Sequence, residues 1–124
     1  APGVKVMYIA GDAGDEEFVK KAVEVVTGPE GLGGCDILVN ATRVGMKPLD
    51  GETLVDPALF RADLVVADTV YNPRETRMIR EARAAGCQAA VGGIGMLLWQ
   101  GVAAFKLYTG KDMPVEEVKE RFFS

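Results

Sequence analysis

The chain has 124 residues, of which 48% are hydrophobic, with 14 basic and 18 acidic side chains and a formal net charge of −4. This size and apolar content favour one domain with a real core. The lack of a basic block argues against a nucleic-acid partner. No uncharged apolar run reaches the roughly 18–20 residues that a membrane span needs.

Histidine, the commonest general base and metal ligand, does not occur in the sequence. The two cysteines, Cys35 and Cys87, lack metal-ligand spacing and are too few for a disulfide framework. We therefore predict no metal site and two free thiols, the usual state of cysteine in a reducing cytoplasm. No signal peptide is recognisable, so a cytoplasmic protein is expected.

The first third of the chain predicts a strand, a helix and a second strand. Residues 4–10 are rich in β-branched side chains and precede a turn at residues 11–14. Asp15 is expected to cap a helix, which ends before a glycine-rich loop at residues 28–34. Residues 36–40 form a short apolar strand of the type buried on both faces of a parallel sheet. The inward stripe of the helix is Phe18, Val19, Ala22, Val23 and Val26.

The middle of the chain begins with a polar loop at residues 43–52, followed by one helical turn at residues 56–60 and a third apolar strand at residues 62–68. Asn72 is predicted to be the N-cap of the next helix, with Pro73 in its first position and Glu75 completing a capping box. The inward stripe of this helix is Met78, Ile79 and Ala82. Gly86 ends the helix, and residues 87–91 form a fourth short strand.

Three glycines, Gly92, Gly93 and Gly95, precede a strongly apolar helix predicted over residues 96–108. Glycine lets the backbone approach a ligand closely, and a helix N-terminus offers free N–H groups. Gln100 lies on the apolar stripe of this helix and must find partners if it is buried. Either the helix belongs to the core and Gln100 bonds a loop carbonyl, or Gln100 faces a polar ligand near the glycine turn.

Gly110 is expected to end that helix, and a last helix beginning near Asp112 is expected to turn Val115, Val118 and Phe122 inward. Strands that alternate with helices predict a parallel α/β sheet flanked by helices, in one domain over residues 1–124. In such sheets ligands bind beyond the C-terminal ends of the strands. Four polar segments lie on that rim, at residues 11–12, 40–48, 69–72 and 92–96.

Each polar side chain on this rim allows two interpretations. Asn40 and Thr42 either form local turn bonds or face a phosphate, ribose or nicotinamide together with Lys47. Tyr71 either presents its hydroxyl to a polyol or carboxylate, or covers the end of the sheet.

Three ordered motifs carry a resemblance to a known family. They are Asn40-Ala41-Thr42-x-x-Gly45-Met46-Lys47-Pro48, Val70-Tyr71-Asn72-Pro73-x-x-Thr76 and Gly93-x-Gly95-Met96-Leu97-Leu98-Trp99-Gln100-Gly101. Over about residues 35–123 the chain resembles the shikimate dehydrogenase family, and most of all its quinate/shikimate branch, which uses either nicotinamide cofactor. The resemblance implies a Rossmann-like fold and reversible hydride transfer between NAD or NADP and a ring hydroxyl of shikimate or quinate.

The same resemblance implies that Lys47 and residues 69–72 line the cofactor and that Gly93 lies beside the nicotinamide. It places Tyr71 and Gln100 near the cyclohexene acid, so these two are the candidate substrate-binding residues. The candidate cofactor-binding residues are Asp12, Asn40, Thr42, Lys47, Thr69, Val70, Tyr71, Asn72, Gly93 and Met96.

The sequence also departs from the family pattern. The family's catalytic Lys and Asp belong to an N-terminal substrate domain, and its glycine-rich loop follows a first strand; this sequence has a counterpart of neither. Residues 4–10 correspond to the family's second strand, and Asp12 then suits a ribose 2′-hydroxyl and opposes a 2′-phosphate. We therefore expect an incomplete NAD(P)-binding domain with no catalytic residue, weak dinucleotide binding and no turnover alone.

An apolar edge strand and the apolar helix at residues 96–108 predict a homo-oligomer, most simply a dimer. The competing expectation is a compact monomer in which residues 28–34 and the N-terminal segment cover the gap. A non-catalytic nucleotide- or metabolite-binding domain, or an assembly domain, of the same fold is the alternative function.

Overall fold

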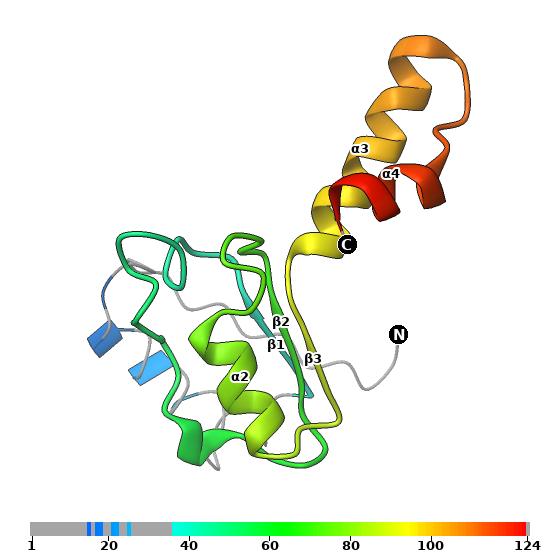
Figure 1. Ribbon diagram of the computed structural model, residues 1–124. Helices are drawn as coiled ribbons and strands as arrows, with labels where there is room; N and C mark the ends of the chain where they lie inside the picture. The colour runs from blue at the N-terminus through cyan, green and yellow to red at the C-terminus, as the bar shows by residue number, and fades with distance from the viewer. Residues whose placement is uncertain (1–14, 16, 19–20, 23–24, 26–35, 124) are drawn as a thin grey trace, which may run out of the picture.

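The structure, a computed structural model, describes residues 15, 17–18, 21–22, 25 and 36–123. Its elements are β1 (Ile37–Asn40), the 3-10 turn η1 (Pro57–Leu59), β2 (Val65–Asp68), α2 (Arg77–Ala84), β3 (Ala89–Val91), α3 (Ile94–Thr109) and α4 (Val115–Phe122). Within the described residues, β1, β2 and β3 form one parallel sheet in that order (Figure 1). This arrangement confirms the predicted α/β fold with a parallel sheet.

The sheet register brings the ends of the strands together. Asn40 at the end of β1 is paired with Asp68 at the end of β2, and Ala67 is paired with Val91 at the end of β3. The main-chain N–H of Thr69 extends the ladder by donating to the Asn40 carbonyl at 2.9 Å. The loops that follow the three strands therefore leave the sheet at one edge, as the sequence predicts.

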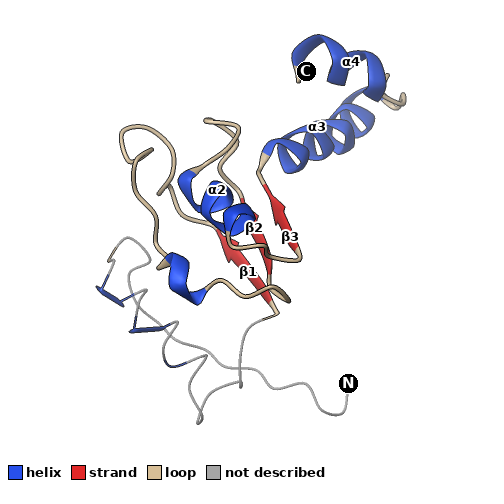
Figure 2. Ribbon diagram, turned by 60° about the horizontal axis from the view of Figure 1, so that its bottom comes forward, coloured by secondary structure: helices blue, strands red, loops and turns tan. Residues whose placement is uncertain are grey.

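Helix α2 covers one face of the sheet and builds the core with it (Figures 1 and 2). Its predicted inward stripe is confirmed, because Met78, Ile79 and Ala82 are all buried. Burying a side chain as large as that of Met78 or Ile79 contributes about 1.5–3 kcal/mol to stability. The buried cluster that holds α2 on the sheet consists of Val44, Leu54, Val55, Phe60, Leu64, Val66, Met78, Ile79 and Ala82.

Burial on both faces was a wrong prediction for β1. Ile37 and Val39 are exposed, whereas Leu38 packs against the buried cluster. Among the described elements, α2 packs on the face of the sheet that carries Leu38, and α3 leads away from the sheet beyond β3 without folding back over it (Figures 1 and 2).

The predicted capping box at Asn72 was also wrong. The N-cap of α2 is Thr76, whose hydroxyl accepts a 3.4 Å hydrogen bond from the Ile79 N–H. The same hydroxyl donates to the carboxylate of Asp68 at 2.6 Å. Thr76 therefore caps the helix and also bonds to the end of β2, eight residues earlier in the chain, and residues 72–75 form bends before the helix. At the other end, Gly86 has φ +76 and follows the C-cap, as expected.

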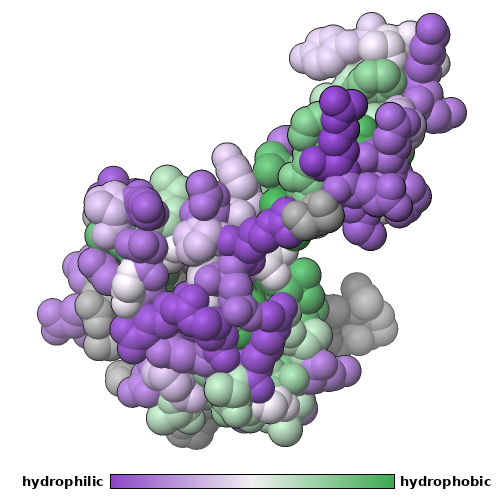
Figure 3. Space-filling model, viewed as in Figure 1, coloured by the Kyte–Doolittle hydropathy of each residue, from purple (hydrophilic) through white to green (hydrophobic). Residues whose placement is uncertain are grey.

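Helix α3 ends where the sequence predicts, at Gly110, which has φ +69 in the left-handed region. The first of its two interpretations, a helix of the core, is wrong: of its residues only Leu98 is buried, and Trp99 and Leu107 are 62% and 85% exposed. Figure 3 shows apolar residues on the visible surface of α3. Phe122 of α4, expected to face inward, is exposed as well.

The predicted helical turn at residues 56–60 is confirmed by η1, which Asp56 caps. Asp15 caps the next residues as expected, because its Oδ1 accepts hydrogen bonds from the N–H groups of Glu17 and Phe18 at 2.9 and 3.2 Å. Among the described residues, no helix has the length and apolar character needed to cross a bilayer. The predictions that lie outside the described residues concern residues 4–10, 11–14 and 28–34, Asp12, Val19, Val23, Val26 and Cys35.

Candidate functional site

The turn between β3 and α3 passes directly against the loop after β2. The Gly93 N–H donates to the Val70 carbonyl at 3.1 Å. A Cβ at Gly93 would lie 2.3 Å from the Thr69 carbonyl oxygen, and one at Gly92 would lie 2.9 Å from the Arg74 carbonyl oxygen. The sequence predicts a close approach of a ligand to this backbone; the structure shows that another stretch of backbone makes the close approach.

The side chain of Asn40 is buried and is fully engaged within the chain. Its Nδ2 donates to the Val44 carbonyl at 2.9 Å and to Asp68 Oδ1 at 3.1 Å. Its Oδ1 accepts from the N–H of Thr42 at 3.0 Å and from the Thr42 hydroxyl at 2.8 Å. These contacts favour the turn-forming interpretation of Asn40 over contact with a ligand.

Asp68 is a buried carboxylate held by three donors. Its Oδ1 accepts from the Val70 N–H at 2.9 Å in addition to the Asn40 amide, and its Oδ2 accepts from the Thr76 hydroxyl. Charge-assisted hydrogen bonds of this kind offset the cost of removing a carboxylate from water. Gly45, with φ +103, packs close beside this group, since a Cβ there would lie 3.1 Å from Thr76 Cγ2.

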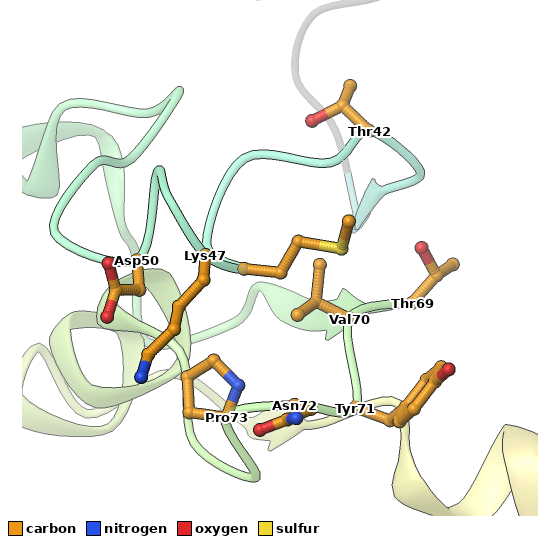
Figure 4. A pocket seen from close by; sticks show the side chains of 9 residues that line it. Thr42, Lys47, Asp50, Thr69, Val70, Tyr71, Asn72 and Pro73 are labelled. Atoms are coloured by element: carbon orange, nitrogen blue, oxygen red, sulfur yellow. The ribbon is translucent and has the colours of Figure 1, made fainter.

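A hollow of about 360 Å³ opens beyond the C-terminal ends of β1 and β2. It is lined by Thr42, Met46, Lys47, Asp50, Thr69, Val70, Tyr71, Asn72 and Pro73. In Figure 4 the side chains of Lys47 and Asp50 lie at one end and those of Thr69 and Tyr71 at the other, with Val70 between them. The hollow therefore has a polar rim and an apolar middle.

Six of the predicted cofactor-binding residues line this hollow: Thr42, Lys47, Thr69, Val70, Tyr71 and Asn72. Asn40 lies behind its wall, and Gly93 is buried against the backbone of the same loop. Met96 and Gln100 are exposed on α3 and do not line the hollow. Asp12 lies outside the described residues.

The lining can bind a polar ligand that has an apolar ring. Within the described residues, Lys47 has no ion-pair partner, so its ammonium group is available to an anionic or carbonyl group. Tyr71 is half exposed at the opposite end, and Val70 offers an apolar contact between them. The pKa of Asp63 is lowered by the hydrogen bond from Arg61, but this pair precedes β2 and lies away from the hollow.

Several residues of the site were not predicted from the sequence. Met46, Asp50 and Pro73 line the hollow, and Asp68 and Thr76 support its walls from behind. One signal was available for the lining residues, because Met46 and Pro73 belong to the motifs and Asp50 lies in the same polar loop as Lys47. The sequence carried no comparable signal for the bond between Asp68 and Thr76, which depends on the fold.

A parallel α/β sheet with a polar hollow beyond its strand ends is the arrangement of Rossmann-like domains, which bind their ligands at that edge. Comparison with known proteins agrees with this class. The model of the shikimate 5′-dehydrogenase C-terminal domain matches residues 93–121.

Two curated relatives extend the match along the chain. A shikimate dehydrogenase (NADP(+)) of Streptococcus uberis is 43% identical over 114 residues, which cover 91% of this chain and 36% of the relative. A quinate/shikimate dehydrogenase of Shigella flexneri is 51% identical over 92 residues, which cover 73% of this chain and 36% of the relative.

A solved structure shares the fold. The shikimate 5-dehydrogenase of Listeria monocytogenes, in complex with shikimate and NAD, matches with a TM-score of 0.67 and 42% identity over 86% of this chain and 34% of that one. In sequence and in fold, this chain corresponds to a C-terminal portion of shikimate dehydrogenases. It spans about a third of the length of the relatives that it matches.

Proposed function

We propose that this chain supplies the cofactor-binding side of an NAD(P)-linked dehydrogenase that acts on a ring hydroxyl of shikimate or quinate. The observation that carries the proposal is the hollow, because two of the three family motifs meet there with Lys47 and Tyr71 at its opposite ends. The relatives add support, since one is named for NADP and a solved one holds NAD and shikimate.

The residues of the hollow suit a nicotinamide cofactor in their chemistry. Lys47 would donate to a ribose, phosphate or carboxamide oxygen, and Thr69 and Asn72 offer further polar contacts. Val70 would contact an apolar ring face. When bound, the cofactor supplies the hydride acceptor or donor, and the residues of this chain bind and orient it.

We further propose that the acid–base residues of the reaction are not among the residues of this hollow. Lys47 and Asp50 both line it, but no hydrogen bond joins them, and the lining contains neither His nor Cys. Tyr71 and Gln100 remain the proposed contacts to the ring acid. Tyr71 lines the hollow and Gln100 is exposed on α3, so both side chains can be reached by a ligand.

Calorimetric titration of the chain with NAD and NADP tests this function. We expect weak binding, about −5 kcal/mol or less favourable, which is a dissociation constant in the high micromolar range or above. Lys47→Ala should weaken it about tenfold, because it removes a hydrogen bond from a charged donor. Lys111→Ala is the matched control, since Lys111 is exposed on the connection between α3 and α4. Equal affinities for Lys47→Ala and the unaltered chain, or no binding by the latter, would contradict the proposal.

A further inference from the structure

The two loops that line the hollow come from different strands, and a chain of hydrogen bonds joins them behind its wall. In the loop after β1, the Val44 N–H donates to the Thr42 hydroxyl at 3.1 Å, and that hydroxyl donates to Asn40. Asn40 in turn donates to Asp68, which receives the Val70 N–H from the loop after β2. Thr42 and Val70 both line the hollow.

The hydrogen bonds from the two loops meet at Asp68, and the burial of Asp68 makes them interdependent. Asp68 is 4% exposed and Thr76 is 1% exposed, so water does not replace a lost donor. Removing one donor from a buried carboxylate leaves part of its charge without compensation. The loss destabilises the remaining hydrogen bonds to Asp68 more than the loss of a hydrogen bond at the surface would. Through these hydrogen bonds, a shift of the Thr76 hydroxyl would reach both loops.

We propose that Asp68 is a positioning residue that couples the two walls of the hollow, with Thr76 holding it in place from the N-terminus of α2. Asp68 does not line the hollow. Its effect on a dinucleotide passes through Thr42 and Val70, and that part of the inference rests on the proposed function.

Amide hydrogen exchange, measured by NMR on the 124-residue chain, tests the coupling without any ligand. Thr76→Val removes the hydroxyl and keeps the shape of the side chain. The exchange rates of the Val44 and Val70 amides should then rise by about tenfold, the effect of losing one charge-assisted hydrogen bond. Thr76→Ser retains the hydroxyl and should leave both rates close to those of the unaltered chain.

Leu54→Ala is the control for general loss of stability, because the Leu54 side chain belongs to the buried cluster and takes no part in the hydrogen bonds that meet at Asp68. Its effect on the Val44 and Val70 amides should be smaller than that of Thr76→Val. Two results would overturn the inference and make Thr76 an ordinary helix cap. Either Thr76→Val changes exchange only at Ile79 and in the rest of α2, or Leu54→Ala accelerates exchange of the Val44 and Val70 amides as much as Thr76→Val does.

Asp68→Asn is a second variant that preserves the size of the side chain should Thr76→Val fail to fold. Replacing the charged acceptor by a neutral amide weakens its hydrogen bonds, so the Val44 and Val70 main-chain amides should exchange severalfold faster. Unchanged exchange rates would refute the coupling.

In a titration with NAD, the folded Thr76→Val variant should bind about tenfold more weakly than Leu54→Ala. Equal NAD affinities of Thr76→Val and Leu54→Ala would show that Asp68 and Thr76 do not position the dinucleotide. Absence of binding by the unaltered chain would instead contradict the proposed function, and the exchange rates would still decide the coupling.

Discussion

The contact of Gly93 with the loop after β2 makes Gly93→Ala the sharpest perturbation of the fold. Gly93 has φ −73 and ψ −5, which alanine adopts without strain, so its backbone conformation does not require glycine. The added methyl group would lie 2.3 Å from the Thr69 carbonyl oxygen and 2.7 Å from the Val70 carbonyl oxygen. Both neighbours are main-chain atoms, so no flexible side chain can move aside.

The expected loss follows from three contributions. Forced overpacking costs up to about 3 kcal/mol, and displacement of the turn would break the hydrogen bond from Gly93 to Val70, worth about 1 kcal/mol. Replacing glycine also restricts the unfolded chain, which offsets about 0.4–1 kcal/mol. The net loss in free energy of unfolding should therefore be about 3 kcal/mol.

Urea unfolding followed by circular dichroism measures this loss through the transition midpoint and slope. Gly95→Ala is the matched control, since a Cβ there meets nothing within 4 Å and the residue lies in the first turn of α3. That variant should be stabilised by about 0.5–1 kcal/mol, because alanine is the better helix former. A loss below about 1 kcal/mol for Gly93→Ala, or equal effects of the two substitutions, would refute the steric argument.

Two further predictions concern the core and the exposed helix α3. Ile79→Ala should cost about 2–5 kcal/mol in the same assay, because Ile79 is 1% exposed, whereas Leu107→Ala on α3 should change stability by less than about 0.5 kcal/mol. We also propose that the chain forms a homo-oligomer through the exposed apolar side of α3. Sedimentation at micromolar concentration should show a species heavier than 13.2 kDa that Trp99→Glu dissociates, and a monomer for the unaltered chain would exclude this interface.

Local chemistry in the sequence predicted most of the elements. Short β-branched and apolar runs identified all three described strands, and the spacing of Met78, Ile79 and Ala82 identified the buried face of α2. Gly110 marked the end of α3, because only a residue that tolerates positive φ closes a helix in this way. Alternation of these elements was sufficient to predict a parallel sheet with its polar loops on one edge.

The tertiary structure decided which polar residues support the site and which line it. Asn40 is engaged by its own turn and by Asp68, a partner 28 residues away, and the start of α2 was set by the bond from Thr76 to that same carboxylate. Asn72 and Thr76 are both common N-cap residues, and local propensity takes no account of the buried Asp68 carboxylate that bonds to Thr76.

The sequence by itself determined the apolar character of α3, but only the tertiary structure decided where that surface lies. Apolar spacing reports that a helix face prefers to leave water, and it does not specify the partner that covers it. In this chain the glycine turn carries α3 past the end of β3 and away from the sheet, so Trp99 and Leu107 remain exposed (Figure 1). The turn that leads into α3 is held by the backbone contacts of Gly93 with the loop after β2, which no periodicity in the sequence encodes.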